Sequence, residues 1–159
     1  MNKIQIVPLQ KHYQMEKNTI DNKIINFINE HHVLNLSTSV NNMPYCAHCF
    51  YVFDEELNRF IFTSDIETKH AQQIIENTSV AIGIALETTM VGQIRGIQII
   101  GNAIPLDGKE EIIASKIYLK KFPFAILKKT KMWSVEINYF KYTDNRLGFG
   151  KKIIWSKND

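Results

Sequence analysis

The stretch FIFTSDIETKHAQQI, residues 60–74, is the part of the sequence best suited to binding an anion. An alternating apolar run gives way to Thr63 and Ser64, and then to Thr68 and Lys69 at the start of a helical pattern. A helix N-terminus presents unpaired N–H groups and a partial positive charge, which suit a phosphate. Hydroxyl donors and an ammonium group strengthen such a site. The alternative is an ordinary capped helix with a solvated lysine, and these residue types do not decide between the two.

A second stretch, CAHC, has the C-x-x-C spacing of redox and zinc sites. Cys46 and Cys49 fall in an apolar run that predicts a strand, so their side chains point to opposite faces. The sequence holds no second cysteine pair to complete a zinc site. We interpret both as packed thiols and predict no disulfide and no metal site. His48 shares a face with Cys46, where it is either a core residue or a ligand contact.

Hydrophobic periodicity predicts a chain dominated by strands. Helices are expected from Ile20 to about His31, from Thr68 to Asn77 and after Asp107. The inward face of the third helix is expected to carry Ile113, Ala114, Ile117 and Tyr118. Strands are expected at VLNLSTSV, YCAHCFYVFD, RFIFTS, SVAIGIAL, GQIRGIQIIGNAIPL, MWSVEINYFKYTD and KKIIW. Gly96 and Gly101 interrupt the fifth strand, which indicates a bulge or a close backbone approach there.

Meandering strands with singly inserted helices favour an antiparallel sheet closed into a small barrel. We therefore predict a mainly β, α+β fold: an antiparallel β-barrel of six to seven strands with about three peripheral helices. The chain has 159 residues and 45% hydrophobic content, which suits one domain over residues 1–159. Residues 1–17 form an N-terminal extension to which the pattern assigns no structure.

Composition narrows the classes of partner. No run approaches the roughly 20 apolar residues of a membrane span, and the N-terminal residues lack a secretory signal, so a cytoplasmic protein without a membrane partner is expected. The net charge of +3 and the pI of about 8.8 are only mildly basic. The lysines between Lys109 and Lys131 are typical of a solvated face rather than of a nucleic-acid-binding stripe.

The order of three stretches, MPYCAHCFYVFD, FIFTSDIETKHAQQI and IRGIQIIGNAIPL, resembles the FMN-binding split barrel of the pyridoxamine 5′-phosphate oxidase superfamily over about residues 20–155. TKHAQ, KFPFA and TDNRLGFGKKIIW are similar to an uncharacterised family of short bacterial split-barrel proteins. The resemblance implies a split β-barrel that forms a homodimer, with FMN at the subunit interface. It also implies a flavin-dependent oxidoreductase that acts on a small-molecule redox substrate.

The resemblance further implies which residues contact the flavin. A strand would run along the ring and the ribityl chain, largely through its backbone, and it carries Ala47, His48, Cys49 and Phe50. Thr63 and Ser64 would meet the ribityl chain or the phosphate, and Thr68 and Lys69 the phosphate.

Three further residues are implied nearer the flavin ring. Arg95 matches a position that the other subunit contributes, and together with His48 it would stabilise negative charge on the reduced ring. Lys151 and Trp155 would close the site, although edge packing is the alternative for Trp155. No catalytic side chain is assigned, because the flavin performs the transfer.

The sequence also departs from the oxidases. Ala47 stands where they carry an arginine for the FMN phosphate, so phosphate affinity rests more heavily on Lys69. Arg146 is retained from their Arg-x-His substrate pair, but Gly148 replaces the histidine, which argues against pyridoxamine 5′-phosphate oxidation. The alternatives are FAD, deazaflavin or haem in place of FMN, a non-catalytic flavin or haem binder acting as a store or sensor, and a basic nucleic-acid module.

Overall fold

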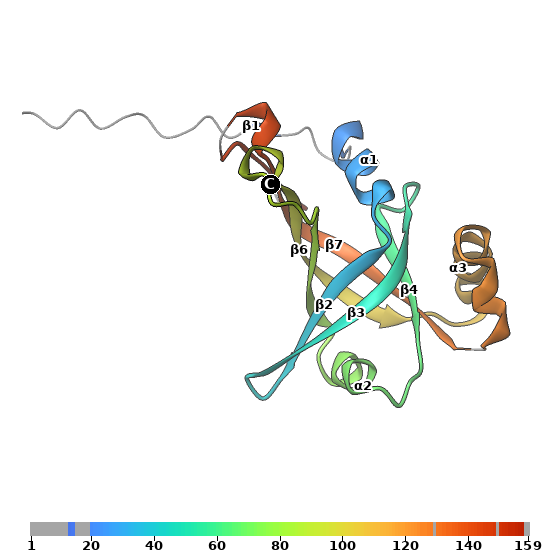
Figure 1. The fold of residues 1–159 in the computed structure, drawn as a ribbon. Helices are drawn as coiled ribbons and strands as arrows, with labels where there is room; N and C mark the ends of the chain where they lie inside the picture. Colours follow the sequence, from blue (N-terminus) through green and yellow to red (C-terminus); the bar gives the residue numbers. More distant parts are fainter. Residues whose placement is uncertain (1–12, 15–19, 129, 149, 158–159) are drawn as a thin grey trace, which may run out of the picture.

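The computed structural model describes residues 13–14, 20–128, 130–148 and 150–157 (Figure 1). The strands are β1 (Tyr13–Gln14), β2 (Val33–Val40), β3 (Met43–Asp54), β4 (Arg59–Ser64), β5 (Ser79–Ala85), β6 (Arg95–Pro105), β7 (Lys131–Asp144) and β8 (Lys152–Ser156). The helices are α1 (Asn22–Glu30), α2 (Lys69–Glu76) and α3 (Gly108–Lys121), and the 3₁₀ turns are η1 (Val91–Gln93), η2 (Pro123–Leu127) and η3 (Asn145–Leu147). The elements expected from the sequence are therefore present, with ends that differ by a few residues.

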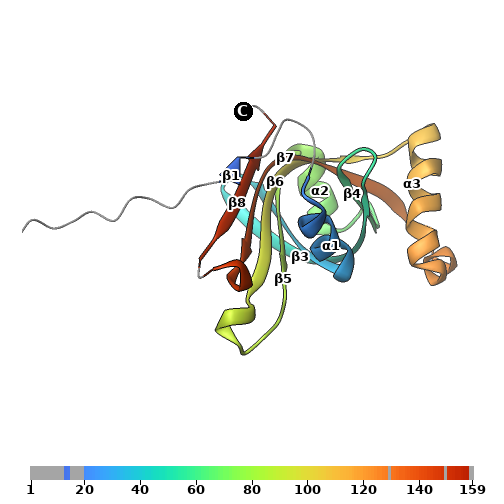
Figure 2. The ribbon, with the colours of Figure 1, turned by 90° about the horizontal axis from the view of Figure 1, so that it is seen from above.

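Six antiparallel strands close a barrel in the order β7-β4-β3-β2-β5-β6, because β6 returns to pair with β7. Strand β8 extends the sheet from β7, and the short β1 pairs in parallel with β8 (Figure 2). The predicted split-barrel, α+β fold is confirmed. Strand β1 falls in the stretch expected to be an N-terminal extension, and the rest of that stretch lies outside the described residues.

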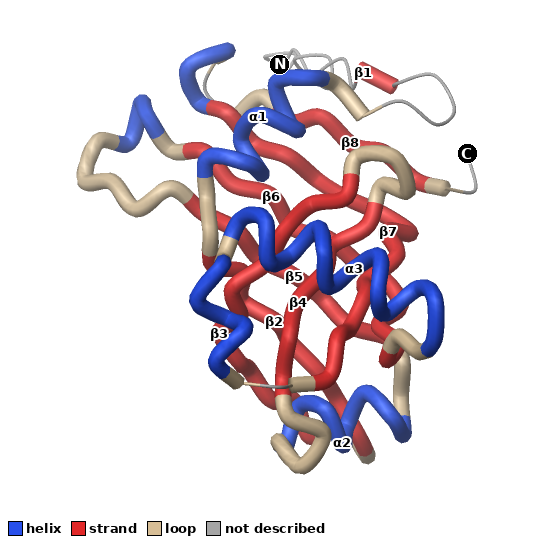
Figure 3. The backbone as a smooth tube through the Cα atoms, turned by 90° about the vertical axis from the view of Figure 1, so that its right-hand side faces the viewer, coloured by secondary structure: helices blue, strands red, loops and turns tan. Residues whose placement is uncertain are grey.

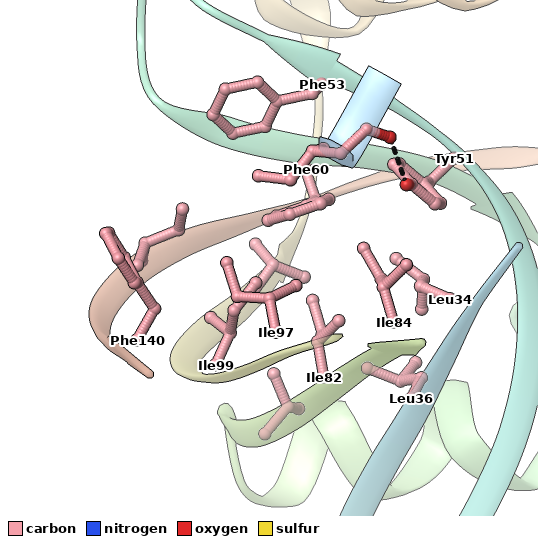
Figure 4. Close-up of a cluster of buried hydrophobic side chains, with 14 of the residues drawn as sticks. Leu34, Leu36, Tyr51, Phe53, Phe60, Ile82, Ile84, Ile97, Ile99 and Phe140 are labelled. Atoms are coloured by element: carbon pink, nitrogen blue, oxygen red, sulfur yellow. Dashed lines mark hydrogen bonds between the residues drawn. The ribbon is translucent and has the colours of Figure 1, made fainter. Parts of the chain in front are cut away.

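Alternating side chains fill the barrel, as strand periodicity requires. On β2 the inward positions are Leu34 and Leu36, and Tyr51 and Phe60 meet them from β3 and β4 (Figure 4). Tyr51 is fully buried and donates a hydrogen bond of 2.5 Å to the carbonyl oxygen of Ile28. This bond ties α1 to the barrel, so the core and the first helix form one packed unit.

The other two helices cover different parts of the barrel. Helix α2 lies at one end, where Ala71 and Ile74 enter the core (Figure 1). Helix α3 crosses the outer face of β3, β4 and β7 (Figure 3) and packs through Ala114 and Tyr118. Ile113 was expected on this buried face and is instead 47% exposed, since α3 meets the barrel along a narrow stripe. None of the described helices has both the length and the apolarity needed to cross a membrane.

The predicted irregularity at Gly101 is a β-bulge. Ile100 pairs with Tyr139 and Gly101 with Ile137, so β7 holds one extra residue at this point. A Cβ atom on Gly101 would lie 2.3 Å from the carbonyl oxygen of Glu136, which no side chain tolerates. The close approach of the two backbones therefore requires glycine.

Candidate functional site

The barrel has an opening between β3 and β4. Strand β3 pairs with β2 from Met43 to Phe50, but its pairing with β4 covers only residues 51–54. Beyond the pair of Tyr51 with Phe62 the two strands part, and β4 continues along β7 to Ser64. Among the described residues, positions 47–50 therefore have no strand partner on this edge. The carbonyl oxygen of Phe50 accepts a 3.4 Å hydrogen bond from the Tyr118 hydroxyl, and the edge groups of residues 47–49 are available to a ligand.

Opposite this edge, the junction of β4 and α2 gathers three polar side chains. Ser64 Oγ lies 2.7 Å from His70 Nε2 and 3.1 Å from Thr68 Oγ1. Thr68 Oγ1 also lies 3.3 Å from His70 Nε2 and donates to the carbonyl oxygen of Asp65 at 2.8 Å. The Thr68 hydroxyl is thus engaged away from the helix, and it does not cap α2. The first-turn N–H groups of α2 remain without a side-chain cap, which suits an anion.

Lys69 is exposed in the first turn of α2. Its Nζ lies 4.7 Å from the centroid of the Tyr45 ring, on the β2–β3 hairpin. No acidic side chain pairs with it among the described residues. The neighbouring Asp65 is instead paired with Lys128, which keeps that carboxylate from Lys69. An ammonium group without a counter-ion beside an uncapped helix is an arrangement that attracts a phosphate.

His70 provides a pH-dependent test of this corner, because burial lowers its pKa below the ordinary 6.5. Below pH 6.5 the unfolded chain binds a proton that the folded chain does not. The contribution to stability is therefore present above pH 6.5 and is lost as the pH falls from 6.5 toward the lowered pKa of the folded chain. We expect the free energy of unfolding, measured by denaturation, to fall between about pH 7.5 and about pH 5.5. His70→Asn should flatten this dependence and His32→Asn, at an exposed position, should retain it. An unchanged slope in His70→Asn contradicts the prediction.

Thr63 and Ser64 do not face the same space. Ser64 turns toward α2, whereas Thr63 turns outward, where its hydroxyl pairs with that of Thr130 and lines a cavity beside α3. Adjacent residues of a strand point to opposite faces, which explains the separation. A ligand at the opening therefore meets the Thr63 side chain and the Ser64 cluster from different sides.

The predicted residues of β3 are divided between the two faces of the strand. Ala47 and Cys49 point into the barrel, while His48 and Phe50 are exposed on the outside. The core interpretation of His48 is therefore wrong, and its ligand contact stays a prediction. Cys46 is exposed and Cys49 is buried, which confirms that the two thiols lie on opposite faces. The interpretation of both as packed thiols is therefore wrong for Cys46, whose thiol donates to Asn35 Oδ1 on the surface. Burial raises the pKa of the Cys49 thiol to about 11, so it is a packed and unreactive group.

Arg95, Lys151 and Trp155 lie at the other end of the barrel from α2. Arg95 pairs in register with Asp144 at the end of β7, and its guanidinium forms an ion pair of 3.0 Å with Glu30. Trp155 stacks on Phe140 with 5.6 Å between ring centroids, which is the edge packing named as its alternative. Within one chain, these residues and the α2 junction are not brought together.

His70 and Tyr45 are site residues that the sequence interpretation did not assign. His70 follows Thr68 by two positions in the first turn of the helix, and that spacing is the signal that was available. Tyr45 meets Lys69 only because the hairpin folds back toward α2, which no local pattern indicates. No group of three metal-ligating side chains occurs in the described part of the chain.

Comparison with known proteins supplies the family. Over 131 residues the chain is 39% identical to the UPF0306 protein plu4501 of Photorhabdus laumondii. The aligned region covers 82% of this chain and 92% of that protein. The chain belongs to the UPF0306 family. Another UPF0306 protein, from Serratia proteamaculans, is 35% identical over 135 residues, 85% of this chain and 94% of its own length. No family model matches the chain.

Solved structures of low sequence identity share the split-barrel fold of this UPF0306 member, as the resemblance implied. A haem binding protein from Mycobacterium smegmatis aligns with a TM-score of 0.69 and 14% identity, covering 83% of this chain but only 56% of that one. A FAD-binding protein from Mesorhizobium loti gives a TM-score of 0.64 at 9% identity, with 77% and 92% covered. A NimC/NimA family protein from Clostridium acetobutylicum gives 0.66 at 17% identity, with 85% and 90% covered. At these identities the likeness shows the fold.

Proposed function

We propose that this UPF0306 protein is a flavin-dependent oxidoreductase that binds FMN at the interface of a homodimer. The observation that carries the proposal is the opening between β3 and β4. It has an unpaired strand edge at residues 47–50 opposite an uncapped helix N-terminus, where the Lys69 ammonium lies over the Tyr45 ring and has no acidic partner among the described residues. One end of this opening offers hydrogen bonds to a polar ring, and the other offers positive charge to a phosphate.

These residues fit the parts of FMN. The backbone of residues 47–49 suits the hydrogen-bonding edge of the ring. The hydroxyl of Thr63, which also contacts Thr130, would meet the ribityl chain from the outer face of β4. Lys69 and the first turn of α2 suit the phosphate. Ala47 is too small to take the role of an arginine, so Lys69 supplies the side-chain charge in the proposed site. When bound, the flavin supplies hydride or electron transfer, and the protein positions and tunes it.

A second chain is needed to complete the proposed site. Arg95 lies at the far end of its own barrel, so it reaches a flavin near α2 only from the other subunit. The outer face of the sheet offers apolar surface to a second subunit, because Val33, Phe50 and Ile100 are 42%, 56% and 50% exposed there. In that position Arg95 places a guanidinium beside negative charge on the ring, and His48 adds an imidazole from the outer face of β3. The proposed substrate is a small molecule that exchanges a hydride or electrons with the flavin.

The first experiment is a spectrum of the purified protein with mass spectrometry of the released cofactor. We expect a flavin spectrum, FMN by mass, bleaching by NADH or NADPH, and a dimer by sedimentation. A monomer without a flavin, even after FMN is added, contradicts the proposal.

Lys69→Ala should weaken FMN binding by roughly 1.5–3 kcal/mol, the scale of a charged hydrogen bond, because the phosphate then depends on the helix N-terminus alone. Fluorescence titration of FMN measures the affinity, and thermal unfolding should be unchanged since Lys69 is exposed. Lys109→Ala is the matched control, because Lys109 is an exposed lysine in the first turn of α3. Equal FMN affinity in the two variants would remove Lys69 from the site.

A non-catalytic haem or flavin binder is the second candidate, and one of the aligned structures is that of a haem binding protein. A Soret band in the purified protein would favour haem, and a flavin that NADH and NADPH leave oxidised would favour a store or sensor. The nucleic-acid alternative has less support, since Lys128 and Lys131 are paired with acidic side chains. Its measurement is the salt dependence of nucleic-acid affinity.

A further inference from the structure

A cavity of about 510 Å³ lies between α3, η2 and the adjoining ends of β4 and β7. Its apolar lining includes Ile112 and Leu119 from α3, Ile126 from η2 and Met132 from β7. Ile112 and Ile126 are 58% and 73% exposed, so the opening leaves apolar surface in water. Small-molecule sites have this range of volume and this predominance of apolar side chains.

The walls of the cavity are held by contacts of the protein itself. Ala114 and Tyr118 fix α3 on the barrel, where they pack with Val52 and Ile61. The end of η2 is held by the ion pair of Lys128 with Asp65, and Glu111 on α3 reaches Lys131 on β7 at 3.4 Å. The space between α3 and η2 therefore exists without a ligand to shape it.

The charged side chains of the lining differ in whether they have a partner of opposite charge. Glu111 and Lys128 already have partners of opposite charge, but Lys116 has none among the described residues. Helical neighbours three and four positions from Lys116 include no acid; they are Ile112, Ile113, Leu119 and Lys120. An anion that enters the cavity therefore meets one unpaired ammonium group, on a wall that combines apolar side chains with the hydroxyls of Thr63, Ser115 and Thr130.

We propose that this cavity binds an apolar monocarboxylate, with its hydrocarbon body against Ile112, Leu119 and Ile126 and its carboxylate on Lys116 Nζ. A phosphate ester suits it less, because the described lining offers neither an arginine nor a second unpaired lysine, and a dianion costs more to desolvate beside apolar walls. The proposal does not depend on the flavin, although the cavity includes Thr63 and so adjoins the proposed flavin site.

Calorimetry on the full chain, cleared of bound lipid, tests the site with decanoate and with uncharged 1-decanol. We expect decanoate to bind about tenfold more tightly than decanol, because only the carboxylate pairs with Lys116. Lys116→Met keeps the apolar stem and removes the charge, so it should erase that tenfold difference and leave decanol binding unchanged. Lys120→Met, one turn along the same helix and outside the lining, should behave as the wild type.

Ile126→Glu gives an independent check, because it places a carboxylate at the cavity mouth. The position is exposed, so the substitution should not unfold the protein. It should abolish binding of both probes with an unchanged thermal midpoint. Absence of decanoate binding to the wild type, including the case in which a second copy covers the cavity, overturns the proposal. So does equal affinity for decanoate and decanol, or wild-type decanoate affinity in Lys116→Met. FMN affinity should be unchanged in these variants. Lys69→Ala should weaken FMN binding and leave decanoate binding unchanged. The two measurements therefore test the cavity and the flavin site separately.

Discussion

Trp133→Ala is expected to lower the free energy of unfolding by about 3–5 kcal/mol, the range for truncating a buried large aromatic side chain. Trp133 has no exposed surface and pairs across β7 and β4 with Phe62, whose ring stacks on it at 6.2 Å. Its removal leaves a void between two strands whose backbones are fixed by the barrel, so the site cannot collapse. Urea denaturation of the variant and the wild type measures the loss.

The indole of Trp133 also connects the core to the α2 junction. Its Nε1–H donates to the carbonyl oxygen of Ser64 at 3.2 Å, and the side chain of Ser64 contacts His70. Trp133→Phe keeps an aromatic ring and removes this donor, so it should cost less, about 1–3 kcal/mol, mainly from the unsatisfied carbonyl. A loss in Trp133→Ala no larger than in Trp133→Phe contradicts the packing argument.

Arg59→Met is expected to destabilise the protein by about 3–5 kcal/mol, because it leaves a buried carboxylate without its charge partner. Arg59 Nε lies 3.0 Å from Asp54 Oδ2, and Nη1 lies 3.0 Å from Glu110 Oε2 on α3. Asp54 is only 7% exposed, and its carboxylate also accepts a long hydrogen bond of 3.4 Å from the N–H of Leu57. Denaturant unfolding again measures the change.

Two comparisons separate the destabilisation caused by an unpaired buried charge from the stabilisation contributed by the ion pair. Arg59→Met combined with Asp54→Leu should recover most of the loss, since no buried charge remains. Arg59 Nη2 has no hydrogen-bond partner among the described residues, which limits the net value of the native pair. Lys157→Met removes the surface pair with Glu136 and should cost less than about 1 kcal/mol. A small loss in Arg59→Met, similar to that in Lys157→Met, would show that water reaches Asp54.

Local patterns predicted the elements well because each depends on neighbours in the sequence. The two-residue period that fills the barrel from β2 and β3 also separates Cys46 from Cys49. A bulge or a close backbone approach was predicted at Gly96 and Gly101, since a glycine inside a strand indicates one of the two, and the bulge lies at Gly101. Side chains that face another element were predicted less well: Ile113 is exposed and His48 is not in the core.

In the candidate site, too, residues close together in the sequence were predicted, and those that meet only in the folded chain were not. Thr63, Ser64, Thr68 and Lys69 were identified from the sequence because they are contiguous at a strand-to-helix junction. The roles of His70 and Tyr45 depend on how the side chains of α2 and the hairpin meet in space. The position of Arg95 at the far end of the barrel depends on the pairing of β6 with both β5 and β7.

By itself, the sequence determined the strands, the helices and the gathering of hydroxyl side chains and Lys69 at the β4–α2 junction, because hydrophobic period and helix-end chemistry act over a few residues. The tertiary structure alone decided that β6 closes on β7, that β3 pairs with β4 only from Tyr51 onward, and that α3 and η2 leave a cavity beside Lys116. These features arise from contacts between residues far apart in the chain. A hydrophobic pattern and a turn fix the register within one hairpin, but the pairing of strands far apart in the chain depends on the packing of the whole barrel.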